Sequence, residues 1–231
     1  MIVCHQYRFI FLKTSKTAGT SIELALSKFC GPEDIITPNP PDSETIRRDL
    51  GRPRFQNCLA PWWDYRLKDL AHLVRERELK LRFFDHMPAR AIKPLLGEEI
   101  WNGYFKFCVE RNPWDRALSL YHWRHRSGPK PPLAEFFSSD APLLRLRQSG
   151  FELYTLGSEL AVDRICFYEN LQPELEEVRT HIGLPEPLDL PRANSSSRTD
   201  KRHYRELFGE AQRERIRRVF RREIELFGYE F

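Results

Sequence analysis

The sequence of 231 residues lacks a long apolar run. No stretch approaches the roughly eighteen apolar residues that a membrane-spanning helix requires. The start of the chain also has no apolar segment of the kind found in secretory signal peptides. We therefore expect a cytoplasmic protein without a transmembrane segment.

Cysteine is scarce and scattered. The five cysteines are never closely spaced: Cys4, Cys30, Cys58, Cys108 and Cys166. They form neither a C-x-x-C metal motif nor a disulfide framework, which favours a reducing compartment. Cys108 and Cys166 lie within apolar runs, and this predicts buried thiols. The spacing of histidine, cysteine and carboxylate residues predicts no metal site.

The chain also lacks a strong excess of charge of either sign. Lysine and arginine total 37, against 33 aspartate and glutamate residues. This mild basic excess suits an anionic cofactor or an acidic saccharide, although a solvated basic surface is the commoner explanation. With 41% hydrophobic residues, the chain is expected to form a single domain over residues 1–231. The arginines near its end alternate with glutamates, which indicates exposed ion pairs and no nucleic-acid partner.

What the chain does contain is a strand-to-helix junction near its start. Residues 7–12 end in an apolar run typical of a buried parallel strand. The spacing of the apolar residues then changes to that of one helix face, at Ile22, Ala25, Leu26 and Phe29. Between the two lies a turn of small and hydroxyl residues, 14–21, that contains Lys16.

Such a turn predicts a binding site for phosphate or sulfate. The N–H groups of the first helical turn point at one spot, where the helix dipole favours negative charge. Gly19 allows close approach, Lys16 adds a positive charge, and hydroxyl donors come from Thr17, Thr20 and Ser21. Lys16 precedes Gly19, whereas a nucleotide-triphosphatase P-loop has its lysine after the second glycine. A solvated turn before an ordinary helix is the alternative.

A second junction follows at residues 105–123. Asn112 is a natural helix N-cap, and Pro113 suits the first helical position. Arg111 would then leave the carboxyl end of a strand, which is where open α/β sheets bind ligands. Ser119 would lie two turns into the helix.

Together the two junctions resemble the carbohydrate-type sulfotransferases, which use 3′-phosphoadenosine 5′-phosphosulfate (PAPS). In that family a K-T-[AG]-G-T-S loop holds the 5′-phosphosulfate, and an R-N-P-x-D-R-x-x-S-x-Y segment holds the 3′-phosphate. This sequence has K-T-A-G-T-S at residues 16–21 and R-N-P-W-D-R-A-L-S-L-Y at 111–121. The resemblance implies that the cofactor contacts Lys16, Thr17, Ala18, Gly19, Thr20, Ser21, Arg111 and Ser119.

Sulfuryl transfer also needs a base for the acceptor hydroxyl. Residues 81–86 are expected to form a strand ending at His86, and family members often place a histidine there. The pKa of an ordinary histidine, about 6.5, suits this role. Lys16 and His86 are therefore the expected catalytic residues. The alternatives for the base are His5, Asp85, Glu110 and His122.

Two other stretches are less well defined. The composition of loop 192–198 is typical of a linker. The resemblance implies instead that the loop closes over the nucleotide, with Ser196, Ser197 and Arg198 as contacts. Prolines between residues 31 and 63 argue against regular structure through most of that stretch. Trp62 and Trp63 are either packing residues or surfaces for sugar stacking. One long helix is expected over residues 202–227.

The alternation of strands and helices predicts a three-layer, P-loop-like α/β domain, with a central, mostly parallel sheet flanked by helices. The resemblance implies transfer of a sulfuryl group from PAPS to a hydroxyl of a carbohydrate or related acceptor, without a metal. The alternatives are a P-loop kinase-like phosphotransferase and a non-catalytic nucleotide- or saccharide-binding module.

Overall fold

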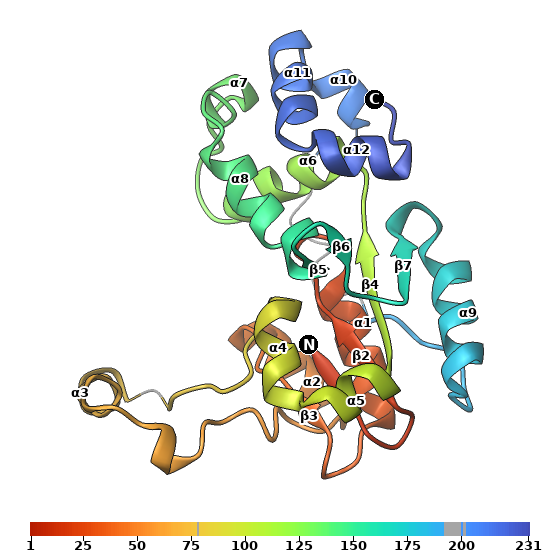
Figure 1. Cartoon of the computed structure of the whole chain (residues 1–231). Helices are drawn as coiled ribbons and strands as arrows, with labels where there is room; N and C mark the ends of the chain where they lie inside the picture. The colour runs from red at the N-terminus through yellow and green to blue at the C-terminus, as the bar shows by residue number, and fades with distance from the viewer. Residues whose placement is uncertain (78, 192–199, 201) are drawn as a thin grey trace.

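A five-stranded sheet forms the centre of the computed structural model, which describes residues 1–77, 79–191, 200 and 202–231 (Figure 1). Its strand order is β3-β1-β2-β4-β7. The strands are β1 (Ile2–Cys4), β2 (Phe9–Leu12), β3 (Ile35–Ile36), β4 (Phe105–Glu110) and β7 (Arg164–Phe167). β2, β4 and β7 pair in parallel, and β1 is antiparallel to both its neighbours. The expected mostly parallel sheet is therefore confirmed.

Helices cover both faces of this sheet. Phe9 and Phe11 of β2 pack with α1 (Gly19–Leu26) and α9 (Leu171–Ile182) on one face. Ile10 and Leu12 point to the other face, which α4 (Ala89–Leu96) and α5 (Glu98–Gly103) cover. Burial on both sides explains why β2 is apolar at every position.

A helical layer continues beyond the carboxyl ends of β4 and β7 (Figure 1). Its core joins α6 (Pro113–Arg124), α8 (Ala141–Gln148), α10 (Tyr204–Leu207) and α11 (Glu210–Val219). The remaining elements there are α7 (Leu133–Phe136) and α12 (Arg221–Phe227). The small hairpin of β5 (Thr155–Leu156) and β6 (Glu159–Leu160) packs instead with α4 in the core on the same face of the sheet. The expected single helix over 202–227 is wrong, because the chain breaks at Gly209 and Phe220 to turn α10, α11 and α12 around the core of the helical layer.

One further expectation is corrected. Residues 81–86 do not form a strand, since only Leu81 bridges, to Leu59, and the chain then turns. Most of residues 31–63 is irregular, as expected, and the main regular parts are β3 and α2 (Pro41–Asp49). Pro41 occupies the start of α2, where its missing N–H removes no hydrogen bond.

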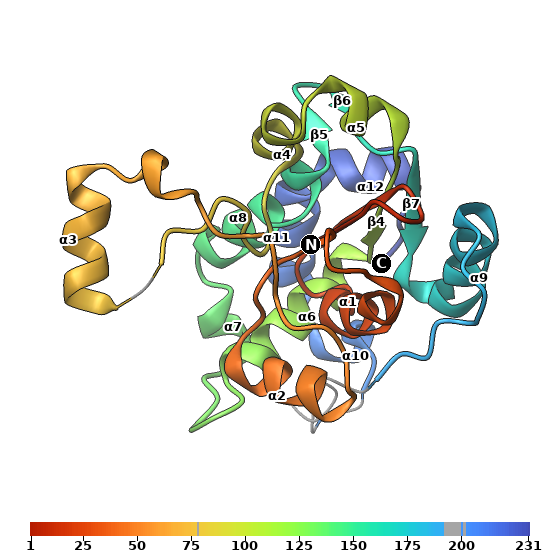
Figure 2. The same cartoon turned by 90° about the horizontal axis from the view of Figure 1, so that it is seen from below.

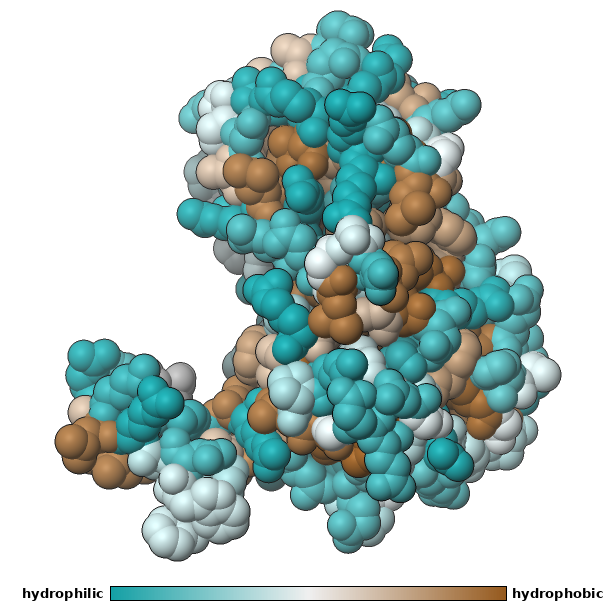
Figure 3. Space-filling view, in the orientation of Figure 1, coloured by the Kyte–Doolittle hydropathy of each residue, from teal (hydrophilic) through white to brown (hydrophobic). Residues whose placement is uncertain are grey.

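An arm built around α3 (Leu67–Glu76) extends away from the sheet in both views (Figures 1 and 2). Figure 3 shows apolar surface on it, and Trp62 and Trp63 are 80% and 69% exposed, so neither is a core residue. The arm begins and ends at one place, because the N–H of Ala60 donates to the carbonyl of Lys80 at 2.8 Å.

None of the helices in the described ranges has the length and apolar character that crossing a bilayer demands. All five cysteines are free thiols. Cys108 and Cys166 are fully buried, as predicted.

Candidate active site

The loop that contains Lys16 lies between the carboxyl end of β2 and the start of α1. Lys16 and Ala18 both have left-handed backbones, with φ of 66° and 62°. Such turns direct successive N–H groups into an anion-binding concavity. Ala18 is the N-cap of α1 and has no side-chain oxygen for the first-turn N–H groups, which therefore stay available for a ligand. A Cβ on Gly19 would lie 2.7 Å from Cγ of Lys13, so this position requires glycine.

Arg111 brings the second motif against this loop. Its Nη1 donates to the backbone oxygen of Lys16 at 3.1 Å. Its Nε and Nη2 donate to Asp115 at 2.9 and 2.6 Å, and the guanidinium lies 3.9 Å from the centre of the Tyr168 ring. The ends of β2 and β4 therefore meet, as the sequence predicts from the parallel-sheet rule.

Arg116, for which the sequence predicted no role, also holds this loop in place through a backbone oxygen. Its Nε donates to the backbone oxygen of Ser15 at 2.8 Å, and its Nη1 pairs with Glu110 at 2.8 Å. Its Nη2 reaches the carbonyl of Ser149, which also accepts from the N–H of Ser15 at 2.8 Å. A Cβ on Gly150 would lie 2.2 Å from Nη2 of Arg116, so the guanidinium occupies space that only glycine leaves open.

The side chain of Lys16 lies among positive charges. Its ammonium is 5.1 Å from the centre of the Trp123 ring, on which Arg126 also stacks at 4.9 Å. Burial, and then the charges of Arg111 and Arg126, lower the pKa of Lys16 to about 7. A bound anion would oppose all three causes, because it stabilises the ammonium and screens the arginines.

Ser119 lies on the face of α6 that is directed toward Lys16 and Arg111. Asp115, Ser119 and Trp123 follow each other at intervals of four residues, which places them on one face of α6. Asp115 contacts Arg111, and Trp123 contacts Lys16. Ser119 therefore lies between the two contacts, with its side chain only partly buried.

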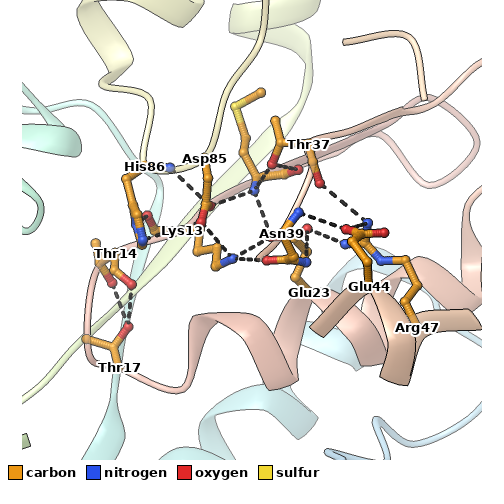
Figure 4. Close-up of polar contacts among 11 residues, drawn as sticks. Lys13, Thr14, Thr17, Glu23, Thr37, Asn39, Glu44, Arg47, Asp85 and His86 are labelled. Carbon is orange, nitrogen blue, oxygen red and sulfur yellow. Dashed lines mark hydrogen bonds and ion pairs between the residues drawn. The ribbon is translucent and has the colours of Figure 1, made fainter. Parts of the chain in front are cut away.

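His86 reaches the carboxyl end of β2 although it does not end a strand. Its Nδ1 is 2.9 Å from the carbonyl of Lys13, so Nδ1 carries the proton that it donates there (Figure 4). Nε2 lies 3.4 Å from Asp85 and is the nitrogen left to accept a proton. Burial lowers the pKa of His86 despite the nearby Asp85 carboxylate. The backbone of His86 is left-handed, with φ of 55°.

A buried ionic network supports this histidine (Figure 4). Lys13 pairs with Asp85 at 3.1 Å and with Glu23 at 3.2 Å. Glu23 also pairs with Arg47 at 2.5 Å, and Asn39 accepts a hydrogen bond from Lys13. Although burial opposes it, the attraction of the two carboxylates raises the pKa of Lys13. Sequence reasoning missed this network, because its members come from separate elements and no local pattern marks them.

The other base candidates are placed differently. Glu110 pairs with Arg116 and accepts a hydrogen bond from Tyr154 at 2.5 Å, which commits its carboxylate to the core. His5 lies 2.8 Å from the hydroxyl of Tyr104 and follows the strand end that pairs with the start of β2. His5 is thus at the opposite edge of the sheet from Lys16. Nδ1 of His122 is 3.4 Å from Nζ of Lys130.

The structure thus brings together Lys16, Arg111 and Ser119, and His86 lies at the same edge of the sheet. Three expected contacts, Ser196, Ser197 and Arg198, lie outside the described residues.

No family model matches the chain. A protein of Archaeoglobus fulgidus, described only as uncharacterized, is 35% identical over 106 residues. The match covers 45% of this chain and 88% of the archaeal protein. The chain therefore belongs to the same family as this archaeal protein.

Proposed function

We propose that the protein is a sulfotransferase with a P-loop-like fold, which moves a sulfuryl group from PAPS to a hydroxyl of a carbohydrate or related acceptor in the cytoplasm. The observation that carries the proposal is the contact between the guanidinium of Arg111 and the backbone of Lys16. It joins two anion-binding elements, one for each charged end of a single nucleotide.

In this proposal the 5′-phosphosulfate lies on the N–H groups of residues 18–21 at the start of α1. Arg111 and Ser119 hold the 3′-phosphate. Asp115 shares the guanidinium of Arg111 and keeps its plane fixed, so the arginine is oriented before the nucleotide arrives.

The reaction is an in-line displacement at sulfur. The acceptor oxygen forms a bond to sulfur as the bond from sulfur to the bridging phosphate oxygen breaks. The acceptor proton passes to Nε2 of His86, and the negative charge that develops on the bridging oxygen is stabilised by Lys16. The products are the sulfated acceptor and 3′-phosphoadenosine 5′-phosphate (PAP).

Ligand competition in a thermal-shift titration tests the donor. PAP should raise the melting temperature at micromolar concentrations, whereas ATP with Mg²⁺ should not. The reverse order would support a kinase-like phosphotransferase and contradict our proposal.

Transfer of labelled sulfate from PAPS to a panel of glycans and lipids tests the reaction. A chain that binds PAP tightly but labels no acceptor would be a non-catalytic binding module.

A further inference from the structure

A second cluster of reactive side chains lies at the opposite edge of the sheet from Lys16. It contains Cys4, Cys30 and Asp34, whose ligand atoms all lie within 4.8 Å of one another. Cys4 ends β1, Cys30 follows the 3-10 helix η1 (Ser27–Phe29), and Asp34 precedes β3. Three separate segments therefore deliver two sulfur atoms and a carboxylate to one point.

The carboxylate of Asp34 is held in a fixed orientation. Its Oδ1 accepts a hydrogen bond from the N–H of His5 at 2.6 Å, and its Oδ2 accepts one from the N–H of Gly31 at 2.8 Å. Oδ2 also lies 3.2 Å from Sγ of Cys4. Outer hydrogen bonds of this kind orient metal ligands and strengthen metal binding.

The separations suit a small tetrahedral ion. Zinc binds sulfur at about 2.3 Å and carboxylate oxygen at about 2.0–2.2 Å, so neighbouring ligands of a tetrahedral site lie about 3.5–3.8 Å apart. The distance between Cys4 and Asp34 is slightly shorter than this range and would open a little around a metal. Cys4 is fully buried, whereas Cys30 is only partly buried and gives an ion access from solvent.

We propose that Cys4, Cys30 and Asp34 bind one zinc ion, with water in the fourth position. Two thiolates select a soft or borderline ion over magnesium or calcium. On binding, each thiol releases its proton to solvent and the sulfur bonds to the ion. In this position the ion links β1, η1 and the start of β3. Because the cluster lies at the opposite edge of the sheet from Lys16, the ion takes no part in chemistry at the loop.

Cobalt(II) titration of the reduced full-length chain tests the ligand set. One equivalent of cobalt chloride should give a thiolate-to-cobalt charge-transfer band and the intense visible bands of tetrahedral cobalt, and zinc chloride should abolish them. Cys30→Ser should remove at least half of the charge-transfer intensity and lower zinc affinity at least tenfold. Cys58→Ser, which removes a buried thiol outside the cluster, is the control and should leave both unchanged.

Melting curves give a second readout, independent of sulfuryl transfer. Zinc at about one hundred times its Kd should raise the melting temperature of the wild-type chain by about 5–10 °C, and Asp34→Asn should reduce this shift. The proposal is overturned if wild-type protein shows no thiolate band, or if Cys30→Ser binds cobalt as well as the wild type does. A chain that binds no metal but forms a disulfide between Cys4 and Cys30 in air would also overturn it.

Discussion

Lys16 and Arg111 do different work in the proposed site, although both are cations beside the same loop. In our proposal Lys16 faces the bond that breaks, and so its charge matters most in the transition state. In the same proposal Arg111 faces a phosphate that does not react, and so its charge contributes equally to the ground state and the transition state.

Substitution should separate these two roles. Lys16→Ala should lower kcat by about 10²–10³-fold and change the Kd for PAP by less than about tenfold, since a transition-state contact is lost. Arg111→Ala should instead weaken PAP binding, because the phosphate loses a charge-assisted hydrogen bond. Isothermal titration with PAP and single-turnover transfer from PAPS measure the two quantities. Wild-type turnover in both variants would remove the site assignment.

The buried charge of Lys16 should also lower stability in the absence of ligand. Its pKa is about 7 in the folded chain and about 10.5 in the unfolded chain, so the unfolded chain holds more protons between these values. Stability should therefore rise with pH across this window. Lys16→Met removes this pH dependence of stability, and we expect the variant to be more stable than the wild type by up to about 4 kcal/mol at pH 7.

Urea unfolding of both proteins at several pH values checks this prediction. The advantage of Lys16→Met should be largest at pH 7 and below, and it should shrink toward pH 10. An advantage that does not change with pH would show that the charge of Lys16 is not the cause.

At the scale of elements, the loop that contains Lys16 depends on the space that Gly150, which has no side chain, leaves for the guanidinium of Arg116. Gly150→Ala should displace the guanidinium, break its bond to Ser15 and weaken PAP binding by at least about tenfold, together with a lower melting temperature. Gly31→Ala is the matched control, because a Cβ there meets no atom within 4 Å. If the Gly150 variant binds PAP normally, the loop does not depend on this contact.

The strands and helices also show how much of the fold could be predicted from the sequence. β2 with α1 and β4 with α6 were predicted correctly, because apolar spacing and helix caps are local signals. β1 and β3 were missed, since strands of three and two residues carry too few positions for a pattern. The break at Phe220 was missed as well, because packing between distant helices causes it.

The same distinction between local sequence signals and tertiary structure applies to the candidate site. The meeting of Lys16 and Arg111 follows from two strands that run in parallel, and the sequence predicts it. The network around Lys13 and the cluster around Cys4 could not be predicted, because they depend on β1, β3 and α2, whose positions come only from tertiary structure.

At the scale of the whole molecule, the arm around α3 is separable from the sheet. Its two ends are joined by the hydrogen bond from Ala60 to Lys80 and by the antiparallel bridge from Leu59 to Leu81. Replacing residues 61–79 with an Asn-Gly turn should therefore close a hairpin and shift the melting temperature by less than about 3 °C.

The same deletion shows what the arm does. PAP binding should be unchanged, whereas transfer to large acceptors should fall if Trp62 and Trp63 contact them. Calorimetry and transfer assays measure these outcomes. A large loss of stability would show that the arm belongs to the core.

The loop at Lys16 is encoded early in the chain, but the groups that hold it come much later. Thr14 donates to the carbonyl of Val109, Ser15 bonds to Ser149, and Arg111 contacts the carbonyl of Lys16. During synthesis the loop residues leave the ribosome long before these groups, when β2 has its neighbour β1 but not β4. A nascent chain that stops before β4 thus contains the whole loop sequence but none of the groups that hold the loop in shape, so the proposed anion site can form only after residues 109–149 have been added.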